Sequence, residues 1–210
     1  MRKLIASAAL ALLCFGTNVQ AQSAAKILDA TADKINKGGT IHANFKITQF
    51  SGSTENGKTS GEVWMNAECF KMETPEMTTW YDGITLWSML AGSGEVNIVP
   101  PDDSNPMTVS PYQFLGIYKK GYKQSITKGT LRGEAVYTIT LNAKKKNVQP
   151  QTIILDITQQ SHQLLCIRAL QDGDWTRIAL LSYTDHNAAD KDMFRFNASQ
   201  YPNVEVIVLR

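Results

Sequence analysis

The amino-acid sequence predicts a mainly β protein built on a barrel or a strongly curved antiparallel sheet. Short segments that alternate apolar and polar residues recur at intervals of about eight to twelve residues, and turn-forming residues separate most of them. Only two segments have the spacing of an amphipathic helix, at residues 23–37 and 110–118. Strands that follow one another without helices between them favour a closed or curved sheet over a parallel α/β architecture.

The N-terminal segment has the three-part layout of a secretory signal peptide. Arg2 and Lys3 form a cationic start, Leu4–Phe15 is an apolar run of twelve residues, and Val19-Gln20-Ala21 offers small or branched residues to a signal peptidase. The run is too short for a transmembrane helix, which needs about 20 residues. Cys14 lies inside the run and lacks the preceding small residue that lipid attachment requires. We therefore expect cleavage at the end of this segment and a soluble mature protein.

The remaining residues, 22–210, are predicted to form a single domain. Removing residues 1–21 leaves 189 of the 210 residues, a size at which one hydrophobic core can stabilise a domain. It also removes two of the 21 basic residues, so that 19 basic residues balance 19 acidic ones. Nucleic-acid-binding proteins usually carry a basic excess on one face, so no nucleic-acid partner is expected. We expect the protein to be a monomer.

The domain is predicted to begin with a helix and a half-buried strand. Ser23 can cap the helix, and Gly38-Gly39 ends it. Residues 41–48 then alternate, with Ile, Ala and Phe side chains on one side and polar side chains on the other. Ser51–Lys58, rich in Gly, Ser, Thr and Asn, is predicted to be a loop or a hairpin.

Further strands are predicted along the rest of the chain, with one helical interruption. Pro100–Pro106 is an irregular polar loop, and Ser110-Pro111 then begins a short apolar helix that ends before Lys119. We expect this helix and the first one to lie over the open face of the sheet as a lid. The predicted strands are Gly61–Asn66, Cys69–Thr74, Thr79–Tyr81, Thr85–Met89, Glu95–Val99, Tyr122–Lys128, Ala135–Ala143, Gln151–Thr158, Leu164–Leu170, Arg177–Tyr183, Met193–Asn197 and Val204–Leu209.

The sequence shows no catalytic or metal-binding constellation, so we predict a protein that is not an enzyme and uses no cofactor. His42, His162 and His186 lack the close, regular spacing of metal ligands and are expected to be solvated. Cys69 and Cys166 remain after cleavage, and they either form a disulfide or stay as two buried thiols.

Soft apolar side chains are the most informative feature of the mature chain. All methionines except Met1 remain, and Trp64, Trp80 and Trp87 stand near several of them. Methionine is flexible and polarisable, so it adapts to ligands of irregular shape. Any one of these residues can fill an ordinary core. As a group on a curved sheet under a helix, they indicate a pocket for acyl chains.

Several segments resemble the family of periplasmic outer-membrane lipoprotein carriers, LolA. Trp80–Trp87 is similar to the family's aspartate-glycine turn and the leucine-tryptophan strand that follows it. Ser110–Leu115 falls where the family has a proline-led lid helix. The likeness covers nearly the whole mature chain in order. It extends to the family's first, second and closing strands at Ala43–Gln49, Gly61–Met65, Phe194–Phe196 and Val204–Ile207.

The resemblance implies both a fold and a function. The fold is an unclosed, strongly curved antiparallel β-barrel of about 11 strands, with two or three short helices forming a lid over an apolar cavity. The function is to bind the acyl chains of lipid-modified proteins and shuttle them through the periplasm from the inner to the outer membrane. An inner-membrane lipoprotein-release complex and an outer-membrane acceptor are the implied partners. In the family an arginine after the second strand holds the lid, whereas this chain has Asn66-Ala67-Glu68 there. We therefore expect burial, aided by tyrosine hydroxyls, to hold the lid.

Two other functions remain open. A periplasmic sensor or binder of lipids or other hydrophobic ligands would use the same fold without a transport role. An esterase or lipase would need a serine or carboxylate placed with a histidine, and no such set is visible in the sequence. For a carrier or a binder, the residues predicted to contact acyl chains are Phe45, Ile47, Val63, Met65, Phe70, Met72, Leu86, Trp87, Met89, Phe114, Leu115 and Tyr118.

Overall fold

The computed structural model describes residues 23–37, 39–99, 117–119, 121–186 and 191–209. Within these ranges the chain forms one α-helix, three short 3-10 helices and thirteen strands, so the fold is mainly β as predicted. The elements are α1 (Ala24–Lys37), β1 (Thr40–Ser51), β2 (Thr54–Met65), β3 (Phe70–Glu73), β4 (Met77–Tyr81), β5 (Leu86–Leu90), β6 (Glu95–Val99), η1 (Ile117–Lys119), β7 (Tyr122–Leu131), β8 (Glu134–Ala143), β9 (Thr152–Thr158), β10 (Leu164–Gln171), β11 (Asp174–Leu180), β12 (Thr184–His186), η2 (Lys191–Phe194), η3 (Ala198–Gln200) and β13 (Glu205–Val208).

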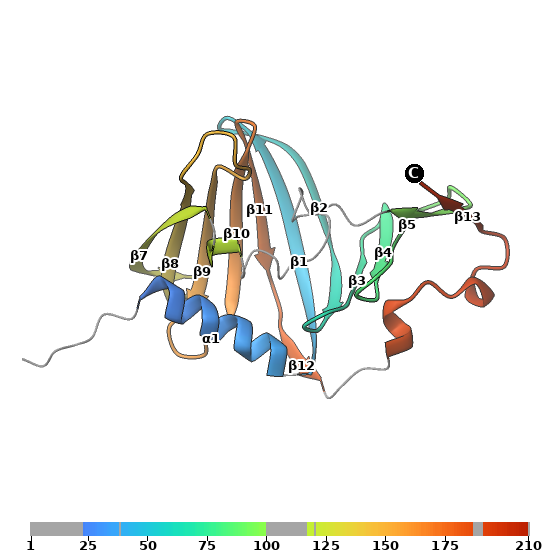
Figure 1. Ribbon diagram of the computed structural model, residues 1–210, viewed down its shortest axis with the longest axis horizontal. Helices are drawn as coiled ribbons and strands as arrows, with labels where there is room; N and C mark the ends of the chain where they lie inside the picture. The colour runs from blue at the N-terminus through green and yellow to red at the C-terminus, as the bar shows by residue number, and fades with distance from the viewer. Residues whose placement is uncertain (1–22, 38, 100–116, 120, 187–190, 210) are drawn as a thin grey trace, which may run out of the picture.

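All thirteen strands belong to one open, curved sheet. Its order is β13-β6-β5-β4-β3-β2-β1-β11-β10-β9-β8-β7, and β12 pairs with the start of β1. The pairing of β13 with β6 is parallel, and the other described pairings are antiparallel. In Figure 1 the sheet runs from β7 on the left to β13 on the right, and α1 lies across the lower part of β7–β10. The predicted unclosed β architecture is confirmed.

The first helix forms where the sequence predicts it and buries one stripe of side chains. The Ser23 hydroxyl accepts a hydrogen bond from the backbone N–H of Lys26 at 3.3 Å, which satisfies one of the free donors at the helix start. Ile27, Leu28 and Ile35 are fully or almost fully buried. Their spacing places them on one side of the helix, so this stripe faces the sheet.

Two tight hairpins set the register of the C-terminal half. Asp172-Gly173 joins β10 to β11 and Arg132-Gly133 joins β7 to β8, with positive φ at both residues of each pair. Two-residue turns of this kind match the natural twist of paired strands. Because the Asp172-Gly173 turn is so short, β11 begins at Asp174. The predicted strand Arg177–Tyr183 was therefore placed too late in the chain.

At Ser51–Lys58, where the sequence predicts a loop or a hairpin, the structure has a hairpin. β1 continues to Ser51, and β2 begins at Thr54, so that only two residues turn between them. Ladder pairing extends to Ser51 opposite Thr54, with a bulge between Gln49 and Phe50. This end of the hairpin is largely exposed on both faces, so its residues need not be apolar. Polar composition alone therefore did not distinguish an exposed strand from a loop.

The predicted strand at Met193–Asn197 is also wrong. Residues Lys191–Phe194 form the 3-10 helix η2, and the backbone N–H of Arg195 donates to the carbonyl of Asp192. Phe194 is completely buried, which anchors this short element without strand pairing. Asn197 then caps η3 by accepting a hydrogen bond from the backbone N–H of Ser199 at 3.0 Å.

Candidate functional site

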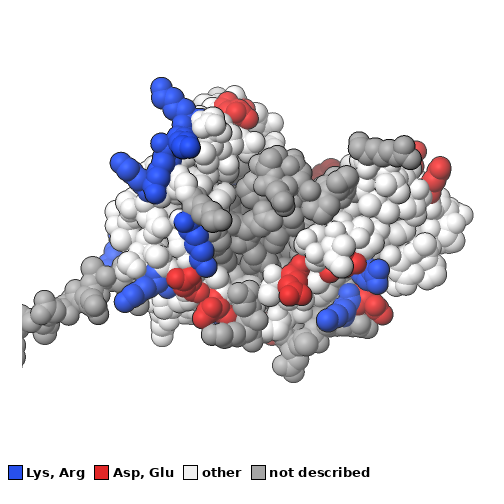
Figure 2. Space-filling model, viewed as in Figure 1, with Lys and Arg blue, Asp and Glu red and all other residues white. Residues whose placement is uncertain are grey.

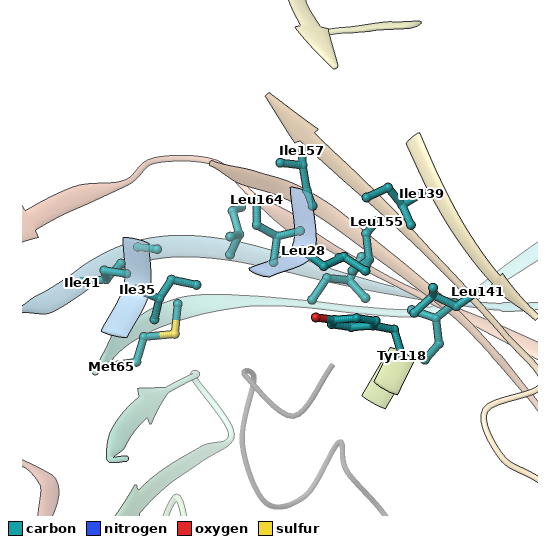
Figure 3. Close-up of a cluster of buried hydrophobic side chains, with 14 of the residues drawn as sticks. Leu28, Ile35, Ile41, Met65, Tyr118, Ile139, Leu141, Leu155, Ile157 and Leu164 are labelled. Carbon is teal, nitrogen blue, oxygen red and sulfur yellow. The ribbon is translucent and has the colours of Figure 1, made fainter. Parts of the chain in front are cut away.

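Apolar side chains from both halves of the sheet meet in one buried cluster on the face that α1 covers. We call this side of the sheet the inner face and the cluster the inner cluster. Its members come from α1, η1, β1–β3, β5 and β7–β11, so strands far apart in the sheet order point toward a common centre. This convergence shows that the inner face is the concave one. Figure 3 labels Leu28, Ile35, Ile41, Met65, Tyr118, Ile139, Leu141, Leu155, Ile157 and Leu164.

The inner cluster contains no ionised side chain among the described residues. The buried polar or charged side chains in the described part of the chain are five threonines and Asp156. Asp156 stands between Leu155 and Ile157, which both belong to the inner cluster, so strand alternation directs the carboxylate to the opposite face. An apolar surface without buried charges is suited to hydrocarbon.

A hydrogen bond joins α1 and η1, the two elements that lie over the inner face and that we call the cover. Tyr118 of η1 is buried, and its hydroxyl donates to Asp29 Oδ1 of α1 at 2.5 Å. Lys119 adds a longer ion pair, with 3.7 Å between its Nζ and the same oxygen. Burial, followed by the hydrogen bond to Asp29, raises the pKa of Tyr118, so the hydroxyl remains a donor at neutral pH. This contact joins segments that are 89 residues apart in the sequence.

Replacing Tyr118 with phenylalanine is expected to loosen this contact without opening a cavity. The free energy of unfolding should fall by about 1 kcal/mol, because a charge-assisted hydrogen bond is lost at a partly exposed carboxylate. Urea titration of the wild type, Tyr118→Phe, Asp29→Ala and the double variant measures the coupling. If Tyr118→Phe costs as much in the Asp29→Ala background as in the wild type, the two side chains do not act together.

Eight of the twelve residues predicted to contact acyl chains belong to the inner cluster or pack against it. Phe45, Val63, Met65, Phe70, Leu86 and Tyr118 are buried in it, and Ile47 and Met72 pack on its edge. Phe114 and Leu115 lie outside the described residues.

Trp87 and Met89 lie on the opposite face of the sheet, which we call the outer face. Leu86 faces inward, and successive residues of a strand point to opposite sides of the sheet. Trp87 and Met89 come one and three residues after Leu86, so both face outward. There Trp87 is buried with Trp80 and Val96, and Met89 packs against this second cluster. The C-terminal segment covers the second cluster with Phe196, Tyr201 and Val204. The structure therefore separates these two residues from the other predicted contacts.

Sequence reasoning missed the contribution of the C-terminal strands to the inner face. Ile153, Leu155 and Ile157 of β9 are completely buried in the inner cluster. Their strict alternation in the sequence was the available signal. The predicted pocket was instead based on methionine and tryptophan, which are concentrated in the N-terminal half. Residues of the two strands paired with β9 complete this part of the inner cluster, namely Ile139 and Leu141 of β8 and Leu164 and Ile167 of β10.

His42 is partly exposed and makes side-chain contacts, whereas the sequence predicts a solvated histidine. It stands on the outer face with its ring stacked on Trp64, at 4.5 Å between ring centroids and 5° between planes. Its Nε2 lies 2.8 Å from Glu62 Oε2, so the imidazole is held between an aromatic ring and a carboxylate. Among the described residues, no three His, Cys, Asp or Glu side chains are placed to hold a metal ion.

Cys69 and Cys166 are free thiols. Cys69 is partly buried just before β3, and Cys166 is buried in β10. Burial raises the pKa of each thiol, so both stay protonated at neutral pH. Of the two alternatives left open by the sequence, the structure has the thiols and not the disulfide.

Asn66, Ala67 and Glu68 form a tight connection between β2 and β3 at the position where the resemblance implies a latching arginine. The side-chain oxygen of Asn66 accepts hydrogen bonds from the backbone N–H of Glu68 at 2.9 Å and of Cys69 at 2.8 Å. Asparagine favours such turns because its side chain can bond the backbone two and three residues ahead. The segment therefore shapes a turn, and the contact that holds η1 comes from Asp29 instead.

The exposed surface carries charges of both signs. Figure 2 shows basic side chains gathered at the upper left of this view, and acidic and basic side chains mixed below the centre. The whole chain has a formal net charge of +2 at pH 7. In the part of the chain that the structure describes, no helix has both the length and the apolar character needed to cross a membrane.

The fold is shared with a solved protein of very different sequence. An uncharacterized conserved protein from Thermus thermophilus superposes with a TM-score of 0.60 at 12% identity, and the match covers 90% of this chain and all of that one. A LolA superfamily protein from Nitrosomonas europaea matches at a TM-score of 0.44 and 12% identity, over 84% of this chain and 99% of that one. A chain of the MucA/MucB complex from Pseudomonas aeruginosa matches at 0.46 and 12% identity, over 83% of this chain and 61% of that one.

The sequence itself places the chain in a family. No curated protein matches it significantly. Residues 15–173, about three quarters of the chain, match the family model described as outer membrane lipoprotein carrier protein LolA. The match runs from the N-terminal segment through α1 and β1–β10 to the turn before β11. Members of this family are carrier or binding proteins and not enzymes, in agreement with the absence of a catalytic constellation from the sequence. The chain therefore belongs to the LolA family of outer-membrane lipoprotein carriers, as a divergent member.

Proposed function

We propose that the protein binds the acyl chains of lipid-modified proteins on the inner face of its sheet and carries them through the periplasm from the inner to the outer membrane. The observation that carries this proposal is the inner cluster, an uncharged apolar surface gathered from nine strands of one curved sheet and covered, within the described residues, by α1 and the 3-10 turn η1. Membership of the family supports it. An inner-membrane release complex and an outer-membrane acceptor would load and unload the protein.

The energetic need for such a carrier follows from the hydrophobic effect. Each buried methylene group is worth roughly 0.8 kcal/mol, so a sixteen-carbon chain in water is unfavourable by on the order of 10 kcal/mol. A carrier must cover this surface and later release it. Non-directional apolar contacts satisfy both needs, because one hydrocarbon surface can replace another without leaving hydrogen bonds unmade.

Binding would proceed by exchange of one apolar partner for another. In the structure the stripe of α1 occupies the inner face, with Ile27 and Leu28 completely buried. Apart from apolar packing, α1 is tied to η1 by the Tyr118–Asp29 hydrogen bond and the weaker Lys119–Asp29 ion pair. An entering acyl chain would take over the contacts of this cover as the cover moves aside. The cost of displacing the cover then lowers the net affinity and permits release.

The proposed function is tested by what the protein carries when it is purified from the periplasm of its native cell. We expect lipid-modified proteins to co-purify, with mass spectrometry detecting their acylated N-terminal peptides. A variant with Leu155→Asp or Met65→Asp on the inner face should lose this cargo if it remains folded. Recovery of free lipid without any acylated protein would favour the alternative, a periplasmic lipid binder or sensor that uses the same face.

Export is a separate expectation. Residues 1–21 are proposed to be removed as a signal peptide, leaving Gln22 as the first residue of the mature protein. N-terminal sequencing of the protein from a periplasmic fraction checks this. An acylated Cys14, or an uncleaved chain in the membrane fraction, would contradict it.

A further inference from the structure

A cavity lies on the outer face of the sheet, away from the inner cluster. Its volume is about 310 Å³. The end of β7 forms one wall through Gly129–Leu131, and strands β8–β11 form the floor. Ile167 and Ile178 belong to or pack on the inner cluster, so their strand neighbours Arg168 and Arg177 point to the outer face and into this cavity. We call it the outer cavity.

The floor of the outer cavity sets two arginines against one carboxylate. Arg168 and Arg177 are directly opposite each other in the pairing of β10 with β11, where like charges repel. Asp156 is the acidic residue in the cavity lining, and its Oδ2 accepts a hydrogen bond from Arg168 Nη2 at 2.9 Å. Its other oxygen accepts from the Thr138 hydroxyl at 2.7 Å. The lining therefore has an excess of one positive charge, and its carboxylate is already engaged.

Donors of both arginines lack a hydrogen-bond partner among the described residues. Arg168 Nε is buried and has no hydrogen-bond partner among the described residues. Arg177 has no ion pair in the described part of the chain; its guanidinium lies over the Phe50 ring, with a 3.4 Å contact to the Thr48 hydroxyl. A guanidinium carries five N–H donors, so these contacts leave most of those of Arg177 unused.

The surroundings of the outer cavity reinforce the positive charge. Lys46 and Lys58 lie on the same face, because Lys46 pairs across from Ala179 and Lys58 across from Thr48. Lys58 is 4.0 Å from Glu55, the limit of an ion pair, and both side chains are largely exposed. Two lysines and one glutamate together add one further positive charge to this face near the cavity.

We propose that the outer cavity binds a small oxyanion, a carboxylate or a phosphate group, between Arg168 and Arg177. Planar guanidinium groups bind carboxylate and phosphate through paired hydrogen bonds, and an anion here would offset the repulsion between the two facing arginines. The site is independent of acyl-chain binding, because it lies on the other face of the sheet. Its ligand is either a free anion or the phosphate of a lipid headgroup.

The test is binding of inorganic phosphate, acetate and glycerol 3-phosphate to the purified protein by calorimetry, at an ionic strength held constant with sodium chloride. Arg177→Gln is the informative variant, since Arg177 lacks an ion-pair partner in the described structure and its loss leaves no buried charge behind. We expect it to fold like the wild type and to weaken phosphate binding by at least about tenfold, the effect of losing one charge-assisted contact. Lys145→Gln, at an exposed site in the loop between β8 and β9, is the matched loss of one positive charge and should bind as the wild type does.

The outcomes distinguish the sources of the anion. Tighter binding of glycerol 3-phosphate than of inorganic phosphate, lost in Arg177→Gln, identifies a headgroup phosphate as the ligand. Equal binding of the two identifies a free anion. If none of the three probes binds beyond the chloride background, or if Arg177→Gln and Lys145→Gln weaken binding equally, the outer cavity is not an anion site. Either result leaves the cargo experiment on the inner face unaffected.

Discussion

Gly61→Ala is expected to destabilise the protein by about 3 kcal/mol or more, because the strand has no room for a methyl group at this position. A Cβ at Gly61 would lie 2.0 Å from the backbone carbonyl oxygen of Glu73 and 2.9 Å from Phe45 Cζ. The carbonyl belongs to the neighbouring strand and cannot rotate away as a side chain can. Phe45 lies directly across from Gly61 in the pairing of β1 with β2, so its ring uses the space that glycine leaves.

Gly129→Ala is the matched control for this substitution. Gly129 also lies in a strand, has no positive φ and would place its Cβ in open space. Its replacement should leave the stability unchanged or slightly raise it, since alanine restricts the unfolded chain. Urea or thermal unfolding of both variants measures the difference. Equal stabilities of Gly61→Ala and Gly129→Ala would show that β2 and β3 can separate at this point without cost.

Leu28→Ala is expected to lower the free energy of unfolding by about 2–5 kcal/mol, the usual cost of truncating a buried leucine. Leu28 is completely buried on the stripe of α1 and faces the inner cluster, as Figure 3 shows. The loss of stability should be concentrated in α1, because this helix contacts the sheet through its buried stripe. Hydrogen exchange should therefore accelerate more in α1 than in β9.

Lys26→Ala tests whether the effect is specific to the buried stripe. Lys26 is exposed on the same helix, and its replacement should change stability by no more than about 0.5 kcal/mol. A comparable loss in both variants would mean that helix propensity, and not packing on the inner face, holds α1 in place.

Local patterns in the sequence predicted the fold class, and eight of the twelve candidate residues lie in or against the inner cluster. The period of two in β1 placed Phe45 and Ile47 on the buried side, and the Ser23 cap with its apolar stripe defined α1. These features depend on a few neighbouring residues, so a sequence pattern can reveal them. The twist and closure of the sheet depend on long-range pairing, which no local pattern specifies.

The failures have equally definite causes. Grouping Leu86 with Trp87 and Met89 ignored the alternation that had been applied correctly to β1. The second cluster was not foreseen, because it forms only when the C-terminal segment returns over β4–β6 and brings Phe196 and Tyr201 against Trp80. A tyrosine hydroxyl was expected to help hold the lid, but its partner Asp29 and the pairing of Arg168 with Arg177 likewise arise from topology.

Two methionines allow a matched test of the proposed acyl-chain site on the inner face of the sheet. Met72 packs against the inner cluster and Met89 against the second cluster on the outer face, and both are partly buried. A photo-crosslinking amino acid placed at either position probes one face only. Comparable thermal unfolding of the two variants confirms that both retain the fold. On irradiation with an acylated lipoprotein, the protein labelled at Met72 is expected to crosslink to the acyl chain and the one labelled at Met89 is not. Crosslinking from Met89 with none from Met72 would place the lipid on the outer face and contradict the account.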